Sequence, residues 1–329
     1  MKKLSLICAA LLCVSLTAFT AGAQTKPIKL SVFSGSIPKN SPTGEALGYM
    51  VELINKNAGG SLLAEAFYDT ELGDATSMVQ GLQQGTIDIG ISGDSYYSGL
   101  VPDIQVYELP FLFSSVEQAR KTVDGPTKET IFKKLEAKGI IGLCFWENGM
   151  RQLSNNVRPV KTPDDLKGIK MRTLPAKVQV EAWKALGALP TSIDAAELYT
   201  ALQLGTVSAQ ENPLAEIEFR KFYEVQKYIT LSNHVYTPFL MSLSKKTADK
   251  LNPEQLKIVK EAALAGQTRE RELATKANAA AKQLLLDKGI IFEENPDLDK
   301  FKALTLPVYT VFTSANGDEL LKAVQSSLK

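Results

Sequence analysis

One arginine in this chain is well placed to recognise a carboxylate. Arg172 follows Ile169 and Met171, whose alternation predicts a short strand, and Thr173-Leu174-Pro175 then turns the chain toward a helix. Ligand sites of α/β sheets lie at the carboxyl ends of strands. A guanidinium can hold a carboxylate through two parallel charge-assisted hydrogen bonds. The alternative is that Arg172 only pairs with a nearby acid at the surface, an interaction of small energetic value.

Residue types that serve other chemistry are scarce. The chain has one histidine, His234, and three cysteines. Cys8 and Cys13 lie in the apolar N-terminal stretch, while Cys144 lies in the apolar run 140–146, which favours a buried strand thiol over a nucleophile. The sequence has no metal-ligand cluster, phosphate-binding glycine loop or Gly-x-Ser-x-Gly motif. We therefore predict no catalytic residue, no metal and no cofactor.

The N-terminus has the organisation of a secretory signal. Lys2 and Lys3 precede an apolar stretch at 4–19, and Ala21-Gly22-Ala23 fits the small-residue cleavage rule, so we expect a signal peptide at 1–23. The alternative, a retained membrane anchor, is disfavoured because the stretch is short for a span. Removal of the signal would change the formal charge from +1 to −1. This near-neutral balance gives no electrostatic reason to expect nucleic acid or an anionic membrane as partner.

Helical and strand patterns alternate along the chain, which predicts an α/β protein with largely parallel sheets. The patterns predict strands at 28–32, 140–146 and 206–210, and a further strand that begins at Ile87. They predict helices at 44–57 and 74–84 and the start of a helix at Thr162. Another helix is expected to begin with a capping box formed by Asp194 and Glu197 and to end near Leu204. Residues 254–288 are rich in helix formers, with only Gly266 interrupting. They predict one long helix, or two abutting ones, that could lie across two lobes.

Six short motifs follow one another through the middle of the chain. They are Gly149-Met150-Arg151-Gln152, Pro163-Asp164-Asp165-Leu166-Lys167-Gly168, Lys170-Met171-Arg172, Ala185-Leu186-Gly187-Ala188, Glu197-Leu198-Tyr199-Thr200-Ala201-Leu202-Gln203 and Gln210-Glu211-Asn212-Pro213. In these motifs the chain resembles the solute-binding proteins of tripartite ATP-independent periplasmic (TRAP) transporters, of the DctP-type family. Weaker agreement runs from Lys29 to about Gln255, including Leu109-Pro110-Phe111. The resemblance thus covers most of the chain.

The resemblance implies an α/β, two-lobed periplasmic-binding-protein fold (type II-like) with a central cleft and a long lobe-spanning C-terminal helix. We expect the chain to cross between the lobes near 148, 237 and 278. Lobe I would then comprise 24–148 plus about 238–278, and lobe II 149–237 plus about 279–329.

The resemblance also implies roles for particular residues. Arg172 matches the family arginine that pairs with the ligand carboxylate, and Arg151 would be a second arginine that contacts the ligand or holds its partners. Asn212 could bind the ligand through its amide, or instead form an Asx turn before Pro213. Aromatic residues near predicted strand ends could wall the cleft or belong to the core: Phe33, Tyr68, Tyr96, Trp146 and Tyr236. The position of His234 suits a structural role near the hinge.

Three small residues depart from the pattern of sugar-acid binders in this family. Ala75 occupies the position near the start of a helix where many relatives carry an acid that can bind sugar hydroxyls. Ala195 and Ala196 are small where some relatives have a bulkier wall. These departures argue against a uronate and leave room for a larger or less hydroxylated acid.

The leading hypothesis is therefore a monomeric periplasmic binding protein. It would capture a small organic acid anion between two lobes and deliver it to a TRAP-type membrane permease. One alternative is a periplasmic sensor that presents its closed form to a receptor kinase. The other is a secreted enzyme acting on an organic acid, which the scarcity of catalytic residues disfavours.

Overall fold

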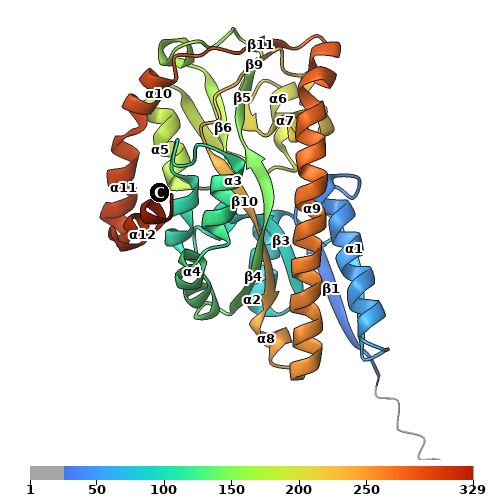
Figure 1. The fold of residues 1–329 in the computed structure, drawn as a ribbon. Coiled ribbons are helices and arrows are strands. Elements are labelled where there is room, and N and C mark those ends of the chain that lie inside the picture. The colour runs from blue at the N-terminus through green and yellow to red at the C-terminus, as the bar shows by residue number, and fades with distance from the viewer. Residues whose placement is uncertain (1–25, 329) are drawn as a thin grey trace, which may run out of the picture.

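Two mixed sheets organise the chain, one in each lobe (Figure 1). The computed structural model describes residues 26–328. The lobe I sheet has the order β2-β1-β3-β10-β4, with β1 Ile28–Ser34, β2 Leu62–Phe67, β3 Ile89–Gly93, β4 Ile140–Met150 and β10 Tyr236–Ser244. The lobe II sheet has the order β11-β9-β5-β8-β6-β7, with β5 Gln152–Asn155, β6 Lys170–Thr173, β7 Leu189–Ser192, β8 Ala209–Asn212, β9 Tyr228–Thr230 and β11 Ile291–Glu293.

The prediction of largely parallel sheets needs one correction. β1 pairs in parallel with β2 and β3, and β6 with β7 and β8, but β10 is antiparallel to both β3 and β4. β5 is likewise antiparallel to β8 and β9. The antiparallel direction of β10 follows from the path of the chain, which leaves lobe I along β4 and returns to it along β10 from the side of lobe II.

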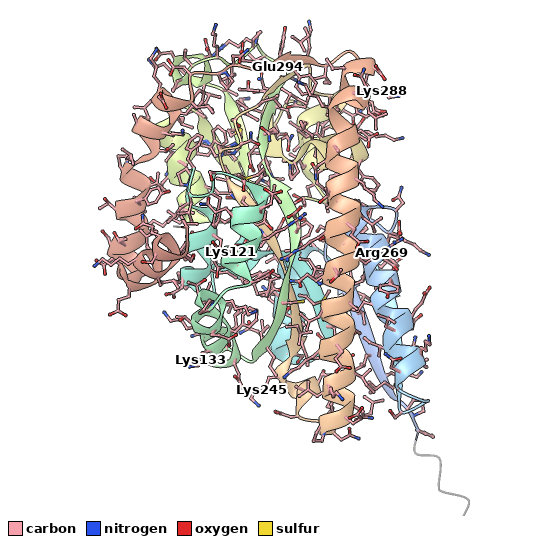
Figure 2. The ribbon with its side chains drawn as sticks, viewed as in Figure 1. Lys121, Lys133, Lys245, Arg269, Lys288 and Glu294 are labelled. Carbon is pink, nitrogen blue, oxygen red and sulfur yellow. The ribbon has the colours of Figure 1, made fainter. Side chains whose placement is uncertain are left out.

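Helices cover both sheets. Lobe I carries α1 Pro42–Asn57, α2 Ala75–Gln84, α3 Val116–Val123, α4 Thr127–Glu136, α8 Lys245–Ala248 and the 3₁₀ segments η1 Asp94–Tyr97 and η2 Pro102–Glu108. Lobe II carries η3 Pro163–Leu166, α5 Lys177–Ala185, α6 Leu198–Gln203, α7 Leu214–Phe219 and η4 Phe222–Glu224. α9 Pro253–Asp287 spans both lobes, and α10 Leu298–Thr305, α11 Pro307–Asn316 and α12 Glu319–Ser327 end the chain. Charged side chains such as Lys133 and Lys288 lie on the outer surface (Figure 2).

Several helix ends follow the local signals in the sequence. The Asp74 side chain accepts a hydrogen bond from Ser77 N at 2.7 Å, and Gly85 ends α2 in the left-handed region with φ 75°. Asn252 and Gln255 form a reciprocal capping box at the start of α9. These caps explain why the predicted boundaries of α2 and α9 are confirmed.

The predicted long helix is a single helix of 35 residues (Figure 1). It packs against α1 and β4 in lobe I and against α7 in lobe II. Gly266 allows the close approach to lobe I, because a Cβ there would lie 2.5 Å from Cζ2 of Trp146. The one glycine inside this helix is therefore a packing requirement and not a break.

The predicted capping box at Asp194 and Glu197 does not form. α6 begins at Leu198, and Glu197 makes no side-chain cap hydrogen bond. The Asp194 carboxylate instead accepts hydrogen bonds from Ala196 N at 2.9 Å and from Ser36 Oγ of lobe I at 2.8 Å. The helix start predicted at Thr162 is the short 3₁₀ segment η3, which does have a capping box.

The C-terminal tail packs differently from the predicted assignment of 279–329 to lobe II. β11 joins the lobe II sheet, and α10 contacts α5. α12, however, packs on η2 and α4, and its Leu321 and Val324 share an apolar cluster with Val106 and Ile131 of lobe I. α11 contacts both η2 and α5. The tail therefore runs from lobe II back onto lobe I.

None of the helices within 26–328 is both long enough and apolar enough to cross a membrane. The predicted signal peptide, 1–23, lies outside the residues that the structure describes.

Candidate functional site

A cavity lies between the two lobes, where β1 and β3 of lobe I and β6 and β8 of lobe II end. The space between its walls, counted together with the part that is open to solvent, is about 440 Å³. Lobe I contributes Gly35, Ser36, Ile37, Gly93, Tyr96, Asn148, Thr237 and Phe239, and lobe II contributes Arg151, Arg172, Leu174, Ala195, Leu198, Asn212, Glu216, Arg220 and Phe222. This is the place at which α/β proteins most often bind ligands.

Arg172 lies in β6 and is 1% exposed. Its Nε donates to the Ile193 carbonyl at 2.8 Å, and this bond orients the guanidinium. Its Nη2 is buried and has no hydrogen-bond partner among residues 26–328. Burial lowers the pKa of Arg172, because removing the charge from water disfavours the protonated form. A carboxylate would supply both the missing acceptor and a compensating charge.

Arg151 is as deeply buried as Arg172 but is paired. It lies between β4 and β5, and its Nη2 donates to Oε1 of Glu211 at 2.8 Å. Its Nε also bonds Oε2 of Glu211, and Nη2 bonds the Glu211 carbonyl. Although burial alone would lower the pKa of Arg151, Glu211 raises it above its ordinary value. Arg151 thus reaches the cavity with its charge already compensated.

Glu211 and His234 complete the support behind Arg151. His234 Nε2 lies 3.3 Å from Oε2 of Glu211, and its Nδ1 lies 2.7 Å from Ser232 Oγ. Burial alone would raise the pKa of Glu211, but Arg151 and His234 hold it at about 2. These contacts fit the structural role that we expect for His234.

Several polar groups of the cavity wall are available to a ligand. Asn212 is the last residue of β8, and its Nδ2 donates to Gln210 Oε1 at 2.6 Å. Asn148 Oδ1 and Thr237 Oγ1 are buried and lack a partner within the described part of the chain. Burial raises the pKa of Tyr96 to about 12, so its hydroxyl is neutral, and it accepts from Ala195 N of lobe II at 3.1 Å.

The aromatic candidates fall into three groups. Tyr96 lines the cavity, whereas Phe33, Trp146 and Tyr236 are buried in the lobe I core and are not among its lining residues. Trp146 Nε1 donates to the Ala263 carbonyl at 3.1 Å, so the one polar atom of this side chain has a hydrogen-bond partner within the core. Tyr68 lines a separate surface groove between α1 and α9.

Phe222 and Phe239 are cavity-lining aromatics that the sequence did not single out. Both lie in segments with ordinary apolar patterns, and no local signal shows which of their faces meets the other lobe. Of the small residues noted in the sequence, Ala195 lines the cavity, while Ala75 and Ala196 do not. Ala75 N instead donates to Ser36 Oγ at 3.2 Å.

Ser36 joins the two lobes over the cavity. Its Oγ donates to Asp194, and its carbonyl accepts from Arg220 Nη2 at 2.6 Å. Ser36 has φ 61°, a left-handed conformation that costs free energy in residues other than glycine. Together with the Tyr96–Ala195 hydrogen bond, these contacts join lobe I to lobe II beside the cavity.

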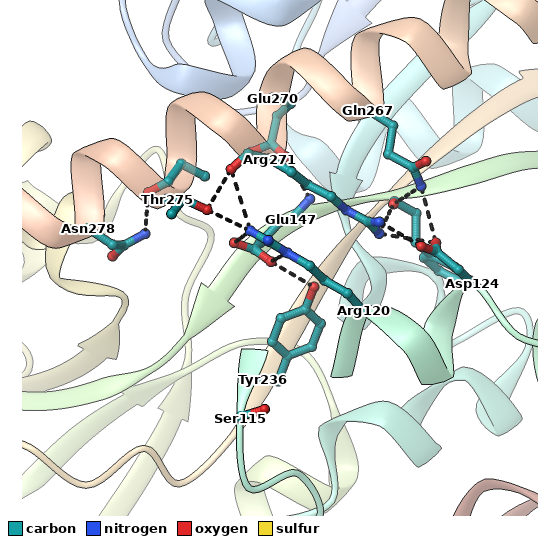
Figure 3. A network of polar contacts seen from close by, with 12 residues as sticks. Ser115, Arg120, Asp124, Glu147, Tyr236, Gln267, Glu270, Arg271, Thr275 and Asn278 are labelled. Atoms are coloured by element: carbon teal, nitrogen blue, oxygen red, sulfur yellow. Dashed lines mark hydrogen bonds and ion pairs between the residues drawn. The ribbon is translucent and has the colours of Figure 1, made fainter. Parts of the chain in front are cut away.

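A buried polar network surrounds the crossing of β4 and α9 (Figure 3). Arg120 of α3 makes two bonds to the Glu147 carboxylate, at 2.6 and 2.8 Å, and Nη2 also donates to Thr275 Oγ1 at 2.9 Å. Tyr236 OH donates to Glu147 at 3.3 Å, and Glu147 N donates to Glu270 of α9 at 3.0 Å. These bonds tie α9 to both β4 and β10, the two strands that lead between the lobes.

Cys144, the one cysteine within residues 26–328, is buried in β4. Burial raises the pKa of Cys144 to about 12, so its thiol is protonated at neutral pH. Within residues 26–328 no group of three or more His, Cys, Asp or Glu side chains could hold a metal ion. The cavity offers hydrogen-bond donors, acceptors and apolar walls, which suits binding.

Residues 33–315 match the family described as bacterial extracellular solute-binding protein, family 7 (DctP). The chain belongs to this family. It is 37% identical over 279 residues to the 2,3-diketo-L-gulonate-binding periplasmic protein YiaO of Escherichia coli, covering 83% of this chain and 84% of that protein. It is 31% identical to the C4-dicarboxylate-binding periplasmic protein DctP of Rhodobacter capsulatus, covering 94% of each.

The solved structures agree with this family membership. The sugar acid binding protein DctPAm of Advenella mimigardefordensis, in complex with galactonate, superposes with a TM-score of 0.89 at 33% identity, covering 92% of this chain and 98% of that one. The resemblance to TRAP solute-binding proteins and the two-lobed fold with a long lobe-spanning helix are therefore confirmed.

Proposed function

We propose that this protein captures a small organic acid anion between its lobes and delivers it to the membrane subunits of a TRAP-type permease. The observation that carries the proposal is the buried guanidinium of Arg172, a residue that lines the cavity and whose Nη2 has no hydrogen-bond partner among residues 26–328. The carboxylate of the ligand would accept from Arg172, with Asn212 beside it. The relatives that bind diketogulonate, C4-dicarboxylates and galactonate support this class of ligand.

Closure of the lobes would be the signal for delivery. Because cavity residues come from both lobes, a ligand that touches both binds the closed state better than the open one and shifts the population toward it. The Ser36–Asp194 and Tyr96–Ala195 hydrogen bonds would form on closing. We further propose that residues 1–23 direct export to the periplasm and that the mature chain acts as a binding protein and not as an enzyme.

A thermal-shift screen tests the proposal. Ligand-stripped mature protein, from Gln24, would be screened against C4-dicarboxylates, sugar acids, branched hydroxy and keto acids, and aromatic acids. A ligand at 100 times its dissociation constant should stabilise the fold by about 2.7 kcal/mol. We expect at least one acid to raise the melting temperature of the wild type and not that of Arg172→Ala. A well-folded protein that responds to no acid would contradict the proposal.

A further inference from the structure

Two buried carboxyl groups of lobe I lie close to each other next to the cavity wall. Asp94 begins η1 and directly follows Gly93 of the cavity wall, and Glu108 is the last residue of η2. Neither side chain is exposed. The positive charge of Arg151 acts on both carboxyl groups, but Arg151 is already paired with Glu211. Because two carboxylates in one buried site repel each other, at most one of this pair is ionised at low cost.

Hydrogen-bond donors reach only one member of the pair. Ser95 Oγ donates to Oε1 of Glu108 at 2.5 Å, and the amide of Gln179 donates to Oε2. Neither oxygen of Asp94 has a hydrogen-bond partner among residues 26–328. Burial and the neighbouring Glu108 raise the pKa of Asp94 well above its ordinary value. Since donors stabilise the ionised form of a carboxyl group, Glu108 carries the negative charge and Asp94 keeps a proton at neutral pH.

Gln179 connects this charge to the binding site in the other lobe. It lies in α5 of lobe II and is 2% exposed. While its Nε2 donates to Glu108, its Oε1 accepts from Leu174 N at 3.4 Å. Leu174 lines the cavity and belongs to the connection 174–176 between β6, which contains Arg172, and α5. One amide thus joins a lobe I carboxylate to the segment that follows Arg172.

Two further hydrogen bonds hold the same region against lobe I. Ser98 Oγ donates to the Pro175 carbonyl at 2.8 Å, and Val178 N donates to Oε1 of Gln105 at 3.2 Å. Both are bonds between neutral groups. The bond from Gln179 has an ionised acceptor, and charge-assisted hydrogen bonds are stronger than neutral ones.

We propose that Gln179 is a positioning residue for ligand capture, which the Glu108 carboxylate of lobe I anchors so that the connection 174–176 holds Arg172 in place for the ligand. Asp94 keeps the anchor at one negative charge by retaining its proton. None of Asp94, Glu108 and Gln179 lines the cavity, so they act on the ligand only through the residues that do. The proposal rests on the proposed function, because it explains how the carboxylate site is held against lobe I.

Dissociation constants from isothermal titration calorimetry test the positioning role. Galactonate, erythronate and succinate are titrated into the wild type at pH 7.5, and the acid that binds most tightly is the probe. Gln179→Met removes both amide hydrogen bonds and keeps the length of the side chain. We expect it to weaken binding at least about 10-fold, because one of the lost bonds has a charged acceptor.

Gln255→Met is the matched control. Gln255 is also buried, and its amide likewise accepts from one group, Asn252 N, and donates to another, the Ser61 carbonyl, but all of them belong to lobe I and its α9. The control should bind the probe within about 3-fold of the wild type even if its melting temperature falls. Equal affinities of Gln179→Met and Gln255→Met would overturn the proposal.

Exchange of the two partners separates positioning from a loss of folding. Gln179→Glu places a third carboxyl group beside Asp94 and Glu108 and should weaken binding at least about 10-fold. Combining it with Glu108→Gln restores one carboxylate and one amide across the same contact, so binding should recover at least about 3-fold. If the double variant is folded by circular dichroism but recovers nothing, the contact between these two residues does not position the site.

Infrared difference spectroscopy of the ligand-free protein at pH 7 tests the proton. Compared with the wild type, Asp94→Asn should lose the C=O stretching band of a protonated carboxyl group. Asp103→Asn is the control, because Asp103 of η2 pairs with Lys134 Nζ at 2.6 Å and should lose only carboxylate absorption. Loss of carboxylate absorption alone in Asp94→Asn would overturn the assignment of the proton.

The outcomes separate the two proposals. If Arg172→Ala abolishes binding but Gln179→Met binds like the wild type, the positioning role is wrong and the carboxylate site stands. If no acid binds to the folded wild type, the proposed function fails and the positioning role fails with it.

Discussion

The cavity and the crossing of β4 with α9 are both buried and charged, but they differ in how their arginines are used. At the crossing, Arg120 makes two bonds to Glu147, and Glu147 also accepts from Tyr236 (Figure 3). In the cavity, Arg172 makes one bond to a carbonyl and leaves Nη2 without a partner within 26–328. The crossing also has one buried arginine nitrogen without a partner, Nε of Arg271, but Arg271 is paired with Asp124 at 2.6 Å. Arg172 has no such ion pair within 26–328, so a ligand carboxylate best explains its position in the cavity.

Arg151 and Arg172 differ in the same way within the cavity wall. Arg151 is as buried as Arg172 but is paired with Glu211, so we propose that its main role is to hold the cavity wall together. Removing Arg151 should therefore mainly lower the stability of the fold, whereas removing Arg172 should mainly weaken ligand binding.

The largest expected loss of stability follows removal of Arg151. Arg151→Ala leaves Glu211 buried without its main partner, and breaking a buried pair in this way costs about 3–5 kcal/mol. Arg172→Ala should cost the ligand-free protein less than half as much, since it removes an uncompensated buried charge. Urea unfolding of both ligand-free variants measures the difference. Equal losses of unfolding free energy in the two variants would contradict the proposed difference between Arg151 and Arg172.

Packing at the crossing should be nearly as sensitive. Gly266→Ala places a methyl group against the Trp146 ring, and overpacking of this kind costs about 1–3 kcal/mol. Gly48→Ala is the matched control inside α1, because a Cβ there would meet only Tyr68 OH, at an ordinary 3.4 Å. The control should be stabilised by up to about 1 kcal/mol through helix propensity. Similar unfolding midpoints for the two variants would contradict the packing role of Gly266.

Glu270, which belongs to the network at the crossing, should make the stability of the protein depend on pH. Burial and the nearby Glu147 raise the pKa of Glu270 to about 8, so the folded protein keeps a proton that the unfolded chain loses near its ordinary pKa of 4.5. The contribution of this group to stability is thus fully present below pH 4.5 and is lost as the pH rises to about 8. The slope for one proton is about 1.36 kcal/mol per pH unit.

Glu270→Gln should remove this slope, because an amide does not titrate. Urea unfolding of the wild type and the variant at pH 6, 7 and 8 should therefore show a difference in stability that moves in favour of the variant as the pH rises. A difference that stays constant with pH would show that Glu270 is ionised in the fold.

The smallest effect is expected where a charge pair is exposed to water. Lys245 and Asp249 lie one helical turn apart, with an Nζ–Oδ1 distance of 2.8 Å and side chains that are 41% and 62% exposed. Lys245→Met should change the free energy of unfolding by no more than about 0.5 kcal/mol. A loss as large as that of Arg151→Ala would show that burial is not what separates these ion pairs.

Local signals in the sequence predicted some features of this molecule and not others. The strand that contains Arg172 and the caps of α2 and α9 follow from side chains a few residues apart, so they could be predicted. The cavity-lining roles of Phe222 and Phe239, and the core positions of Phe33, Trp146 and Tyr236, depend on which strand faces meet across the fold. No short pattern contains that information.

Contacts between the lobes account for the other differences. Asp194 fits a capping box in sequence, but in the structure it accepts from Ser36, a residue 158 positions away. The packing of α12 on lobe I likewise depends on the apolar face that η2 and α4 leave for it. Single-sequence patterns predict the elements, whereas tertiary contacts decide which side chains are free for a ligand.

Isothermal titration of the tightest-binding acid into the wild type, Arg172→Ala and Arg172→Lys tests the central claim most directly. If Arg172 is the charge partner of the ligand, Arg172→Ala should weaken binding at least about 30-fold, which corresponds to about 2 kcal/mol. Arg172→Lys should recover only part of the loss, because a point charge cannot reproduce the guanidinium fork. Binding by Arg172→Ala within about 3-fold of the wild type would contradict the account.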